Sequence, residues 1–576
     1  MIRIGIVFFS LYVFTHGVLY CNQVKGWNIL SDNLRMAEKA IYAAKKYNVN
    51  HLQLSHHMIH NLNEISDTSK LNKINHLTEL AHNEGIAKVY IWDHALYEKQ
   101  YYPQKFFKNN SDQLDLDNEE LWDWIKKDYE KHLKKIKNID GIVLTFIETG
   151  LRIENQYSEL YRTPSQKFKK LIRELNEVFF DGFGLDIVLR TFSYNAKEID
   201  NIIEVVNSID SKNLFIMIKE SNHDFFVTHP PNNLINDISN KKRIIIEFDA
   251  AHEFSGQGVV ASIFPKFHYQ KAKHFSKYKN VVGYSVRIDR YGDTSIIDNP
   301  TEINLFAIEQ GFSNNKSTAE NIIKSFISNK HGDNLVPELY KVYSAAEDII
   351  LSSFYTLGLN TERHSKLNYH YRSIYTRHVS GRWLENPVVF IEHGVNKEYH
   401  YWQDIVNHLS PKRHKSGNGY YKPRSSPKDS ISYRALNLLE IPDVIENEWL
   451  DTLERMNELY LSDILKEKQW SVKESEEILK LIIAIKPKMD DGSHQKLKGI
   501  YHRTLLAARL RSAISAVYYG SRIESKSPNL QKLINKNKAE AERIIKEIEN
   551  YASRYPIGEY DWKKDAELAK IYIDEN

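Results

Sequence analysis

The stretch Gly141-Ile-Val-Leu-Thr-Phe-Ile147 decides the fold, because it is an apolar run between two helical stretches at about 118–136 and 165–179. A short run of this kind, joined to its neighbours through helices, is typical of a strand in a parallel sheet that is covered on both faces. A carboxylate, Glu148, follows the run directly. The stretch therefore predicts an α/β fold with a polar residue at the carboxyl end of a buried strand.

The same alternation of apolar runs and helical stretches continues along residues 24–330. Six further runs lie at 49–54, 86–92, 185–191, 214–218, 243–248 and 281–286. A short piece at 27–30 is the candidate for an eighth strand. About eight repeats over roughly 300 residues predict a (β/α)8 TIM barrel rather than an open sheet. The absence of a glycine-rich phosphate motif after the first strand argues against a dinucleotide-binding fold.

The two ends of the chain differ from this pattern. Arg3 and the apolar run at 4–14 predict an export signal over residues 1–21. Cys21 stands where a bacterial lipoprotein signal would be cut, so it is a candidate for lipid attachment to a membrane. We expect an exported protein, either periplasmic or attached to the outer membrane. After the barrel, expected over residues 22–330, a mainly α-helical C-terminal region is expected over 331–576.

Composition narrows the classes of function. The formal net charge is only +3, from 78 basic and 75 acidic side chains, so we expect no nucleic-acid partner. The single cysteine forms no internal disulfide. No apolar run after the signal is long enough for a transmembrane helix. These features predict a globular exported protein.

Charged side chains follow the apolar runs of the predicted barrel. In this fold, function collects at the carboxyl ends of the strands. Three carboxylates from different strands, Glu148, Asp224 and Glu253, can therefore face one another across the barrel mouth. Hydrolysis of a glycosidic bond needs one carboxylic acid for the leaving oxygen and one carboxylate that activates water or attacks directly. For each single carboxylate, the alternative is a cap or an ion pair at the end of its strand.

The surroundings of the three carboxylates suggest their roles. Apolar neighbours predict a raised pKa for Glu148, which suits the acid. Asp224 and Glu253 stand near basic residues that favour the charged form, which suits a base. These basic residues are Arg190, Lys219, His223 and His252.

Several motifs resemble, in chain order, those of glycoside hydrolase family 67, the α-glucuronidases. Ile147-Glu148-Thr-Gly150 lies where the family has its Ser-Glu-Gly acid motif, and Leu189-Arg190-Thr-Phe192 is similar to its Trp-Arg-Ala-Phe. Ile218-Lys219-Glu-Ser-Asn-His-Asp224-Phe225 resembles Ile-Lys-Asn-Gly-Pro-Ile-Asp-Phe. Glu247-Phe-Asp-Ala-Ala-His-Glu253-Phe-Ser-Gly-Gln257 resembles Glu-Phe-Gln-Ile-Thr-Gln-Glu-Tyr-Leu-Gly-Gln. The resemblance covers about residues 24–330.

The resemblance implies an inverting, exo-acting hydrolase that needs no metal and no cofactor. It would release α-linked glucuronic acid, or its 4-O-methyl form, from plant or algal polysaccharide fragments such as those of xylan. Glu148 would be the general acid, and Asp224 and Glu253 the candidates that position the water. Arg190 and Lys219 would bind the uronate carboxylate. The C-terminal helices would form one side of the pocket or a homodimer interface.

Two departures keep other functions open. Leu144 replaces the family's lysine four residues before the acid, and Leu189 replaces its tryptophan. The alternatives are the same mechanism on another uronic acid or a neutral sugar, and a non-catalytic glycan-binding lipoprotein.

Further residues at strand ends are candidates for substrate contacts. They are His56, Trp92, His223, His252 and Arg287, with Asp289 and Arg290 as an extension. For Trp92 the alternative is packing, and for Arg287 it is an internal ion-pair network. His56, His57 and His60 point in different directions along their segment, so we expect no metal site there.

Overall fold

The computed structural model describes residues 23–574 with gaps, of which the longest covers residues 361–457. The shorter gaps lie at 110, 147, 193–195, 210–212, 222–224, 226, 228–230, 291–293, 315, 357–358, 522, 525, 558–562, 564–565, 567–568 and 571–572. The predicted export signal at 1–21, with Cys21, lies outside the described residues, as do His223 and Asp224.

Eight parallel strands close into a barrel in sequence order, and β1 pairs with β8 to complete the ring. The strands are β1 (Val24–Ile29), β2 (His51–Leu54), β3 (Lys88–His94), β4 (Gly141–Thr145), β5 (Asp186–Arg190), β6 (Leu214–Lys219), β7 (Arg243–Asp249) and β8 (Val281–Arg287). This closed order confirms the predicted (β/α)8 barrel. The short piece predicted at 27–30 overlaps β1.

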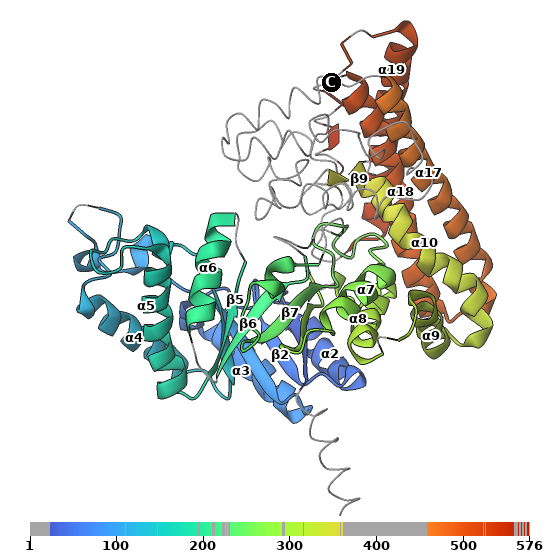
Figure 1. The fold of residues 1–576 in the computed structure, drawn as a ribbon. Coiled ribbons are helices and arrows are strands. Elements are labelled where there is room, and N and C mark those ends of the chain that lie inside the picture. Colours follow the sequence, from blue (N-terminus) through green and yellow to red (C-terminus); the bar gives the residue numbers. More distant parts are fainter. Residues whose placement is uncertain are drawn as a thin grey trace, which may run out of the picture.

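Helices cover the outside of the barrel (Figure 1). They are α2 (Leu34–Ala44), α3 (Thr68–Asn83), α4 (Glu119–Leu133), α5 (Pro164–Asn176), α6 (Ala196–Ser208), α7 (Pro265–Phe275) and α8 (Ile303–Ser313). Side-chain caps fix several of their starts. Asp67 accepts from the Ser69 N–H at the start of α3, and Asn118 from the Glu120 N–H at the start of α4. Between β6 and β7 the described residues form the short 3-10 helix η7 (Asn233–Asn236), where the sequence is also irregular.

The barrel interior is filled by large side chains. Successive side chains of a strand point to opposite faces, so one set fills the interior while the other packs under the helices. The interior cluster consists of Tyr90, Trp92, Val143, Val188, Met217 and Ile245, all of them buried. The barrel therefore has a solid floor, and a site for a ligand can form only above it, at the mouth.

A helical region follows the barrel and rises beside it (Figure 1). It contains α9 (Ala319–His331), α10 (Val336–Phe354), α17 (Glu458–Ala484), α18 (Asp491–Ser521) and α19 (Pro528–Arg554). This agrees with the predicted helical C-terminal region. The apolar cores of these helices include side chains from the connection between β7 and α7. Within the described part of the chain, every helix is too short or too polar to cross a lipid bilayer.

The seam between β1 and β8 leaves no room for a side chain at Gly283. A methyl group there would overlap the backbone of Val24, and β8 is also irregular in register at this point. We expect Gly283→Ala to destabilise the protein by roughly 3 kcal/mol, because the seam would have to open. Denaturant unfolding measures the change. Gly492→Ala is the control, since a methyl there meets only Asp490 Oδ1 at 3.4 Å, and a stability loss equal to that of Gly283→Ala would contradict the tight seam.

Candidate active site

A buried carboxylate, Glu247, is the centre of the barrel mouth. It lies on β7 with a fully buried side chain, and it accepts hydrogen bonds from Arg190 Nε at 2.7 Å and from Arg287 Nε at 3.0 Å. Burial opposes its charged form, but the two guanidinium groups and Lys219 still hold the pKa of Glu247 below its usual value. Three strands, β5, β7 and β8, are thus joined by one carboxylate.

Glu253 continues this network toward the opening of the barrel. Its Oε2 accepts from Arg287 Nη1 at 3.0 Å, and its Oε1 accepts from Arg290 Nη2 at 2.8 Å. Arg287 therefore bridges Glu247 and Glu253, so an internal ion-pair network, one of the two roles predicted for it, is present. The Arg290 side chain keeps 18% of its surface exposed, which leaves part of this cation open to a ligand.

The backbone after β7 sets the direction of Glu253. Asp249 accepts hydrogen bonds from the Ala251 N–H at 3.1 Å and from the Glu253 N–H at 2.6 Å. Burial raises the pKa of Asp249 to about 7, although Arg287 opposes the shift. His252, between them, has a φ of 56°, a left-handed conformation that turns the chain sharply.

His252 does not face the mouth, so its predicted contact with substrate is not found. The sharp turn directs its buried ring toward α7, where its Nε2 lies 2.9 Å from His268 Nε2. The ring also packs 4.3 Å from the ring of Phe264, measured between centroids.

Trp92 is also enclosed, in agreement with the packing alternative. Its indole N–H donates to Gln53 Oε1 at 3.1 Å, and its side chain is fully buried in the barrel interior. The guanidinium carbon of Arg190 lies 4.9 Å from the Trp92 ring centroid. Trp92 is therefore the floor under Arg190 and offers no open face for sugar stacking.

Two phenylalanines that the sequence analysis did not assign to the site pack against its cations. Lys219 Nζ lies 3.8 Å from the ring centroid of Phe192 and 4.6 Å from that of Phe225. The Arg287 guanidinium lies 4.5 Å from the Phe225 ring. Such faces attract cations and exclude water. Phe225 directly follows Asp224, and Phe192 stands two residues after Arg190, so their closeness to charged residues in these motifs is the signal that could have identified them.

The loop after β2 brings histidines to the same mouth. His56 is half-buried, and its Nδ1 lies 2.8 Å from Ser55 Oγ. Burial lowers the pKa of His56 well below its usual value, and the nearby Arg287, Arg290 and Arg190 lower it further. A neutral imidazole suits a hydrogen bond to a sugar hydroxyl beside these cations.

Glu148 belongs to the opposite side of the mouth. It follows β4, which lies four strands from β8 in the closed order of eight. Burial lowers the pKa of His60, on the loop after β2. Glu64 and Glu148 lie close enough to oppose this shift. The side chain of Glu148 is exposed, in contrast to the apolar surroundings predicted from the sequence. β4 ends at Thr145, so Glu148 lies in the connection that follows the strand and not on the strand itself.

Charged groups of both signs meet at the mouth. Four cations, Arg190, Lys219, Arg287 and Arg290, gather around two carboxylates, Glu247 and Glu253. Two further carboxylates at the mouth face backbone N–H groups. Asp249 accepts them within its own loop, and Asp289 accepts from the Leu30 N–H at 2.8 Å. Among the described residues no group of three His, Cys, Asp or Glu side chains is arranged to hold a metal ion.

A second polar cluster lies buried below the Glu253 loop. Glu220 Oε1 accepts from the Asp249 N–H at 3.3 Å, and its Oε2 lies 3.6 Å from His268 Nδ1. Lys271 donates to the hydroxyl of Ser221 in the same cluster. Burial raises the pKa of Glu220 to about 7 and lowers that of Lys271 to about 8, so desolvation outweighs the attraction between the two groups.

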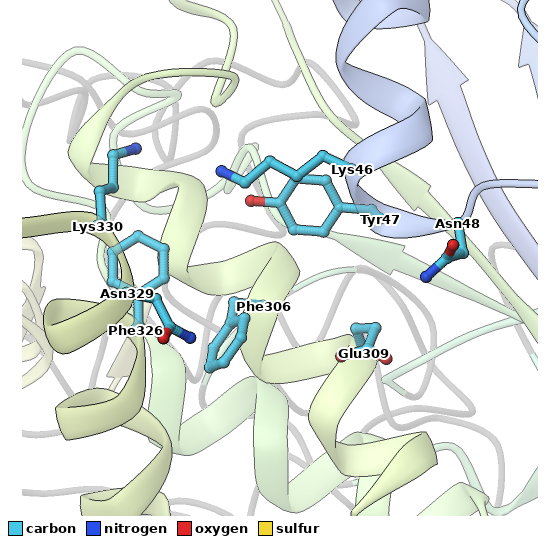
Figure 2. A pocket seen from close by; sticks show the side chains of 8 residues that line it. All are labelled: Lys46, Tyr47, Asn48, Phe306, Glu309, Phe326, Asn329 and Lys330. Carbon is cyan, nitrogen blue, oxygen red and sulfur yellow. The ribbon is translucent and has the colours of Figure 1, made fainter.

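A pocket of about 270 Å³ lies on the outer wall of the barrel, away from the mouth. Figure 2 shows Lys46, Tyr47 and Lys330 reaching toward one another from the 3-10 helix η1 (Lys45–Tyr47) and from α9. All three donate to the buried Glu302. Tyr47 precedes the start of β2 by four residues, so this pocket is at the opposite end of the barrel from Glu253. Its cations join η1 and α9 to the 3-10 helix η9 (Pro300–Glu302).

No protein-family model matches the chain, and no curated protein matches it. Among solved structures, the chain is similar to a mutant of the Thermobaculum terrenum O-GlcNAc hydrolase, with 12% sequence identity and a TM-score of 0.39. The match covers 85% of this chain and 95% of that one. A structural similarity this low says nothing about the reaction. The barrel is established by the closed order of its eight strands.

The raised pKa of Glu220 predicts a pH-dependent stability. In the folded state Glu220 keeps its proton between pH 4.5 and about 7 while the unfolded state loses it, so the contribution of Glu220 to stability falls as the pH rises through that window. His252 and His268, whose pKa values burial lowers, contribute in the opposite direction, so the difference between wild type and a Glu220 variant is the quantity that reports on Glu220. Between pH 5 and 8 we expect the free energy of unfolding of wild type, relative to that of Glu220→Gln, to fall by about 3 kcal/mol. Urea denaturation from pH 5 to 8 measures it. Glu120→Gln, at an exposed site on α4, should follow the wild type, and parallel profiles for Glu220→Gln and wild type would contradict the assignment.

Proposed function

We propose that the protein is an inverting, exo-acting glycoside hydrolase that removes an α-linked glucuronic acid, or its 4-O-methyl form, from plant or algal polysaccharide fragments. The observation that carries the proposal is the placement of Glu253 at the barrel mouth, where Arg287 and Arg290 hold it opposite the strand that leads to Glu148. Two carboxyl groups on opposing sides of a polar mouth are what glycoside hydrolysis requires.

Glu148 is the proposed general acid. Its side chain is exposed at the mouth, so it can reach the leaving-group oxygen of a bound glycan without rearrangement of the core. The carboxyl groups of an inverting pair lie about 6.5–9.5 Å apart, which leaves room for a water molecule between the sugar and the base.

Glu253 is the proposed group that orients the attacking water. Two guanidinium groups fix its carboxylate. The water's proton would then pass either to Glu253 or to Asp224, the second candidate base. The loop after β2 supports the same site, since the neutral His56 can bind a hydroxyl of the sugar.

The preference for an acidic sugar is proposed from the cations. The Arg190 guanidinium is held by Glu247. The Arg290 guanidinium is partly exposed, so it can bind the carboxylate of a ligand in addition to Glu253. Arginine suits this because its fork can bind a carboxylate through two hydrogen bonds. Leu144 favours the alternative of a different uronic acid or a neutral sugar, because it is fully buried and offers no polar group to the substrate.

Removing the acid should abolish most turnover. We expect Glu148→Gln to reduce kcat by about 10²–10⁴-fold with little change in KM, because only the transferable proton is lost. Kinetics on aldouronic acids measure this. The loss should be smaller on an aryl glycoside, whose leaving group needs less protonation.

Glu159→Gln is the control for this experiment, since Glu159 is an exposed carboxylate in the same connection between β4 and α5. Equal turnover of Glu148→Gln and wild type would remove Glu148 from the reaction. A wild-type protein that binds glycans and hydrolyses none would favour the glycan-binding alternative.

Substrate charge should matter through Arg290. We expect wild type to hydrolyse aldouronic acids with inversion, and Arg290→Met to lower kcat/KM on them by about tenfold or more, because a charge-assisted hydrogen bond is lost. Product analysis by NMR gives both the rate and the anomer.

Neutral oligosaccharides of matched length, and Arg543→Met on the exposed face of α19, are the controls. Hydrolysis of only the neutral set would replace the uronic acid with a neutral sugar. A retained anomer would make Glu253 or Asp224 a nucleophile.

A further inference from the structure

The loop that carries Glu253 is bonded directly to the helical C-terminal region. Thr504 and Arg503 are neighbours on α18, more than two hundred residues further along the chain. The Ala261 N–H donates to Thr504 Oγ1 at 2.9 Å, and Arg503 Nε donates to the Val259 carbonyl. Thr504 is fully buried, and its hydroxyl in turn donates to the Ile500 carbonyl at 2.8 Å. The backbone of the loop is thus part of the hydrogen bonding of α18.

Apolar side chains of the same loop lie in the cores of the helical region. Val259 and Val260 are fully buried in a cluster formed largely by α17, α18 and α19. Ala261 and Ile263 are fully buried in a second cluster with residues of α9, α10, α17 and α18. The second half of the loop therefore belongs to the helical cores, while Ala250 and Ala251 in its first half belong to the barrel core.

The barrel side holds the loop at its two ends. Asn304, at the start of α8, donates to the carbonyls of Ala250 at 3.1 Å and of Ser262 at 2.8 Å, and it accepts from the Phe264 N–H at 2.8 Å. Within the loop, Asp249 accepts from the Glu253 N–H at 2.6 Å, and Ser262 Oγ donates to the Ser255 carbonyl at 2.6 Å. The bonds to α18 at Val259 and Ala261 add two fixed points from outside the barrel.

We propose that α18 is a positioning element of the active site, and that Thr504 and Arg503 hold the loop so that Glu253 faces the water at the mouth. The inference rests on the proposed function for its effect on turnover. Both residues act through the loop and touch no reacting atom. The helical region then has a role in the reaction beyond its own folding, since it bonds the loop directly at Val259 and Ala261.

Two variants of Thr504 separate the hydrogen bond from the packing. Thr504→Val keeps the shape but leaves the buried Ala261 N–H without its acceptor, whereas Thr504→Ser keeps the oxygen. We expect amide hydrogen exchange of residues 255–264 to become at least about tenfold faster in Thr504→Val, and to stay near wild type in Thr504→Ser. We also expect kcat to fall by roughly 10- to 100-fold in Thr504→Val with KM little changed, because a displaced base mainly affects the chemical step.

Arg509→Met is the matched control on α18, because Arg509 pairs with Glu547 and Glu540 on α19. It should leave the exchange of the loop as in wild type. Equal exchange in Thr504→Val and wild type would overturn the proposal, as would a loop that exchanges faster while kcat is unchanged. Hydrogen exchange needs no substrate. If wild type hydrolyses no glycan, the proposed function fails, and the exchange data alone still decide whether α18 holds the loop.

Discussion

The ionised Glu247 carboxylate, enclosed between Arg190 and Arg287, is the constraint on which the barrel mouth depends. A fully buried charge is tolerated only when partners surround it, and removal of one partner leaves the others uncompensated at a cost of several kcal/mol. Here Glu247 lies on β7 and its two arginine partners lie on β5 and β8, so the relative positions of these three strands are fixed by charge as well as by the sheet. Because Arg287 also holds Glu253, the position of the outer carboxylate follows from that of the inner one.

The apolar side chains around this network strengthen it. Trp92 lies under Arg190, and Phe225 lies against both Lys219 and Arg287. They exclude water from the inner cations, and electrostatic attraction grows where water is excluded. The mouth therefore has a rigid, dry inner layer and a more open outer layer that contains Arg290 and Glu148. A substrate would meet the outer layer first, and the inner layer would keep its groups in place without rearrangement.

The fold could be predicted from the sequence because most strands from β3 onward are nearly continuous apolar runs that are followed by polar residues, whereas β1 (Val24–Ile29) and β2 (His51–Leu54) contain polar residues and are less distinct. The same pattern identified Glu148, Arg190, Lys219, Glu253 and Arg287 as residues at strand ends, and all of them lie at the mouth. Glu247 was part of a motif but not assigned to the site, although a charge enclosed by the apolar residues Ile244-Ile-Ile and Phe248 indicates a buried ion pair.

The directions of side chains beyond the strand ends could not be predicted in the same way. His252 turns into the protein because its backbone is left-handed, and Glu148 is exposed although apolar residues precede it in the sequence. Each depends on where the loop is held, and the holding groups are distant in sequence. Asn304 and Thr504 both bond the loop that follows β7, and neither is near it in the chain. A local pattern determines which residue ends a strand, whereas the direction of that residue depends on contacts between the barrel and the helices that follow it.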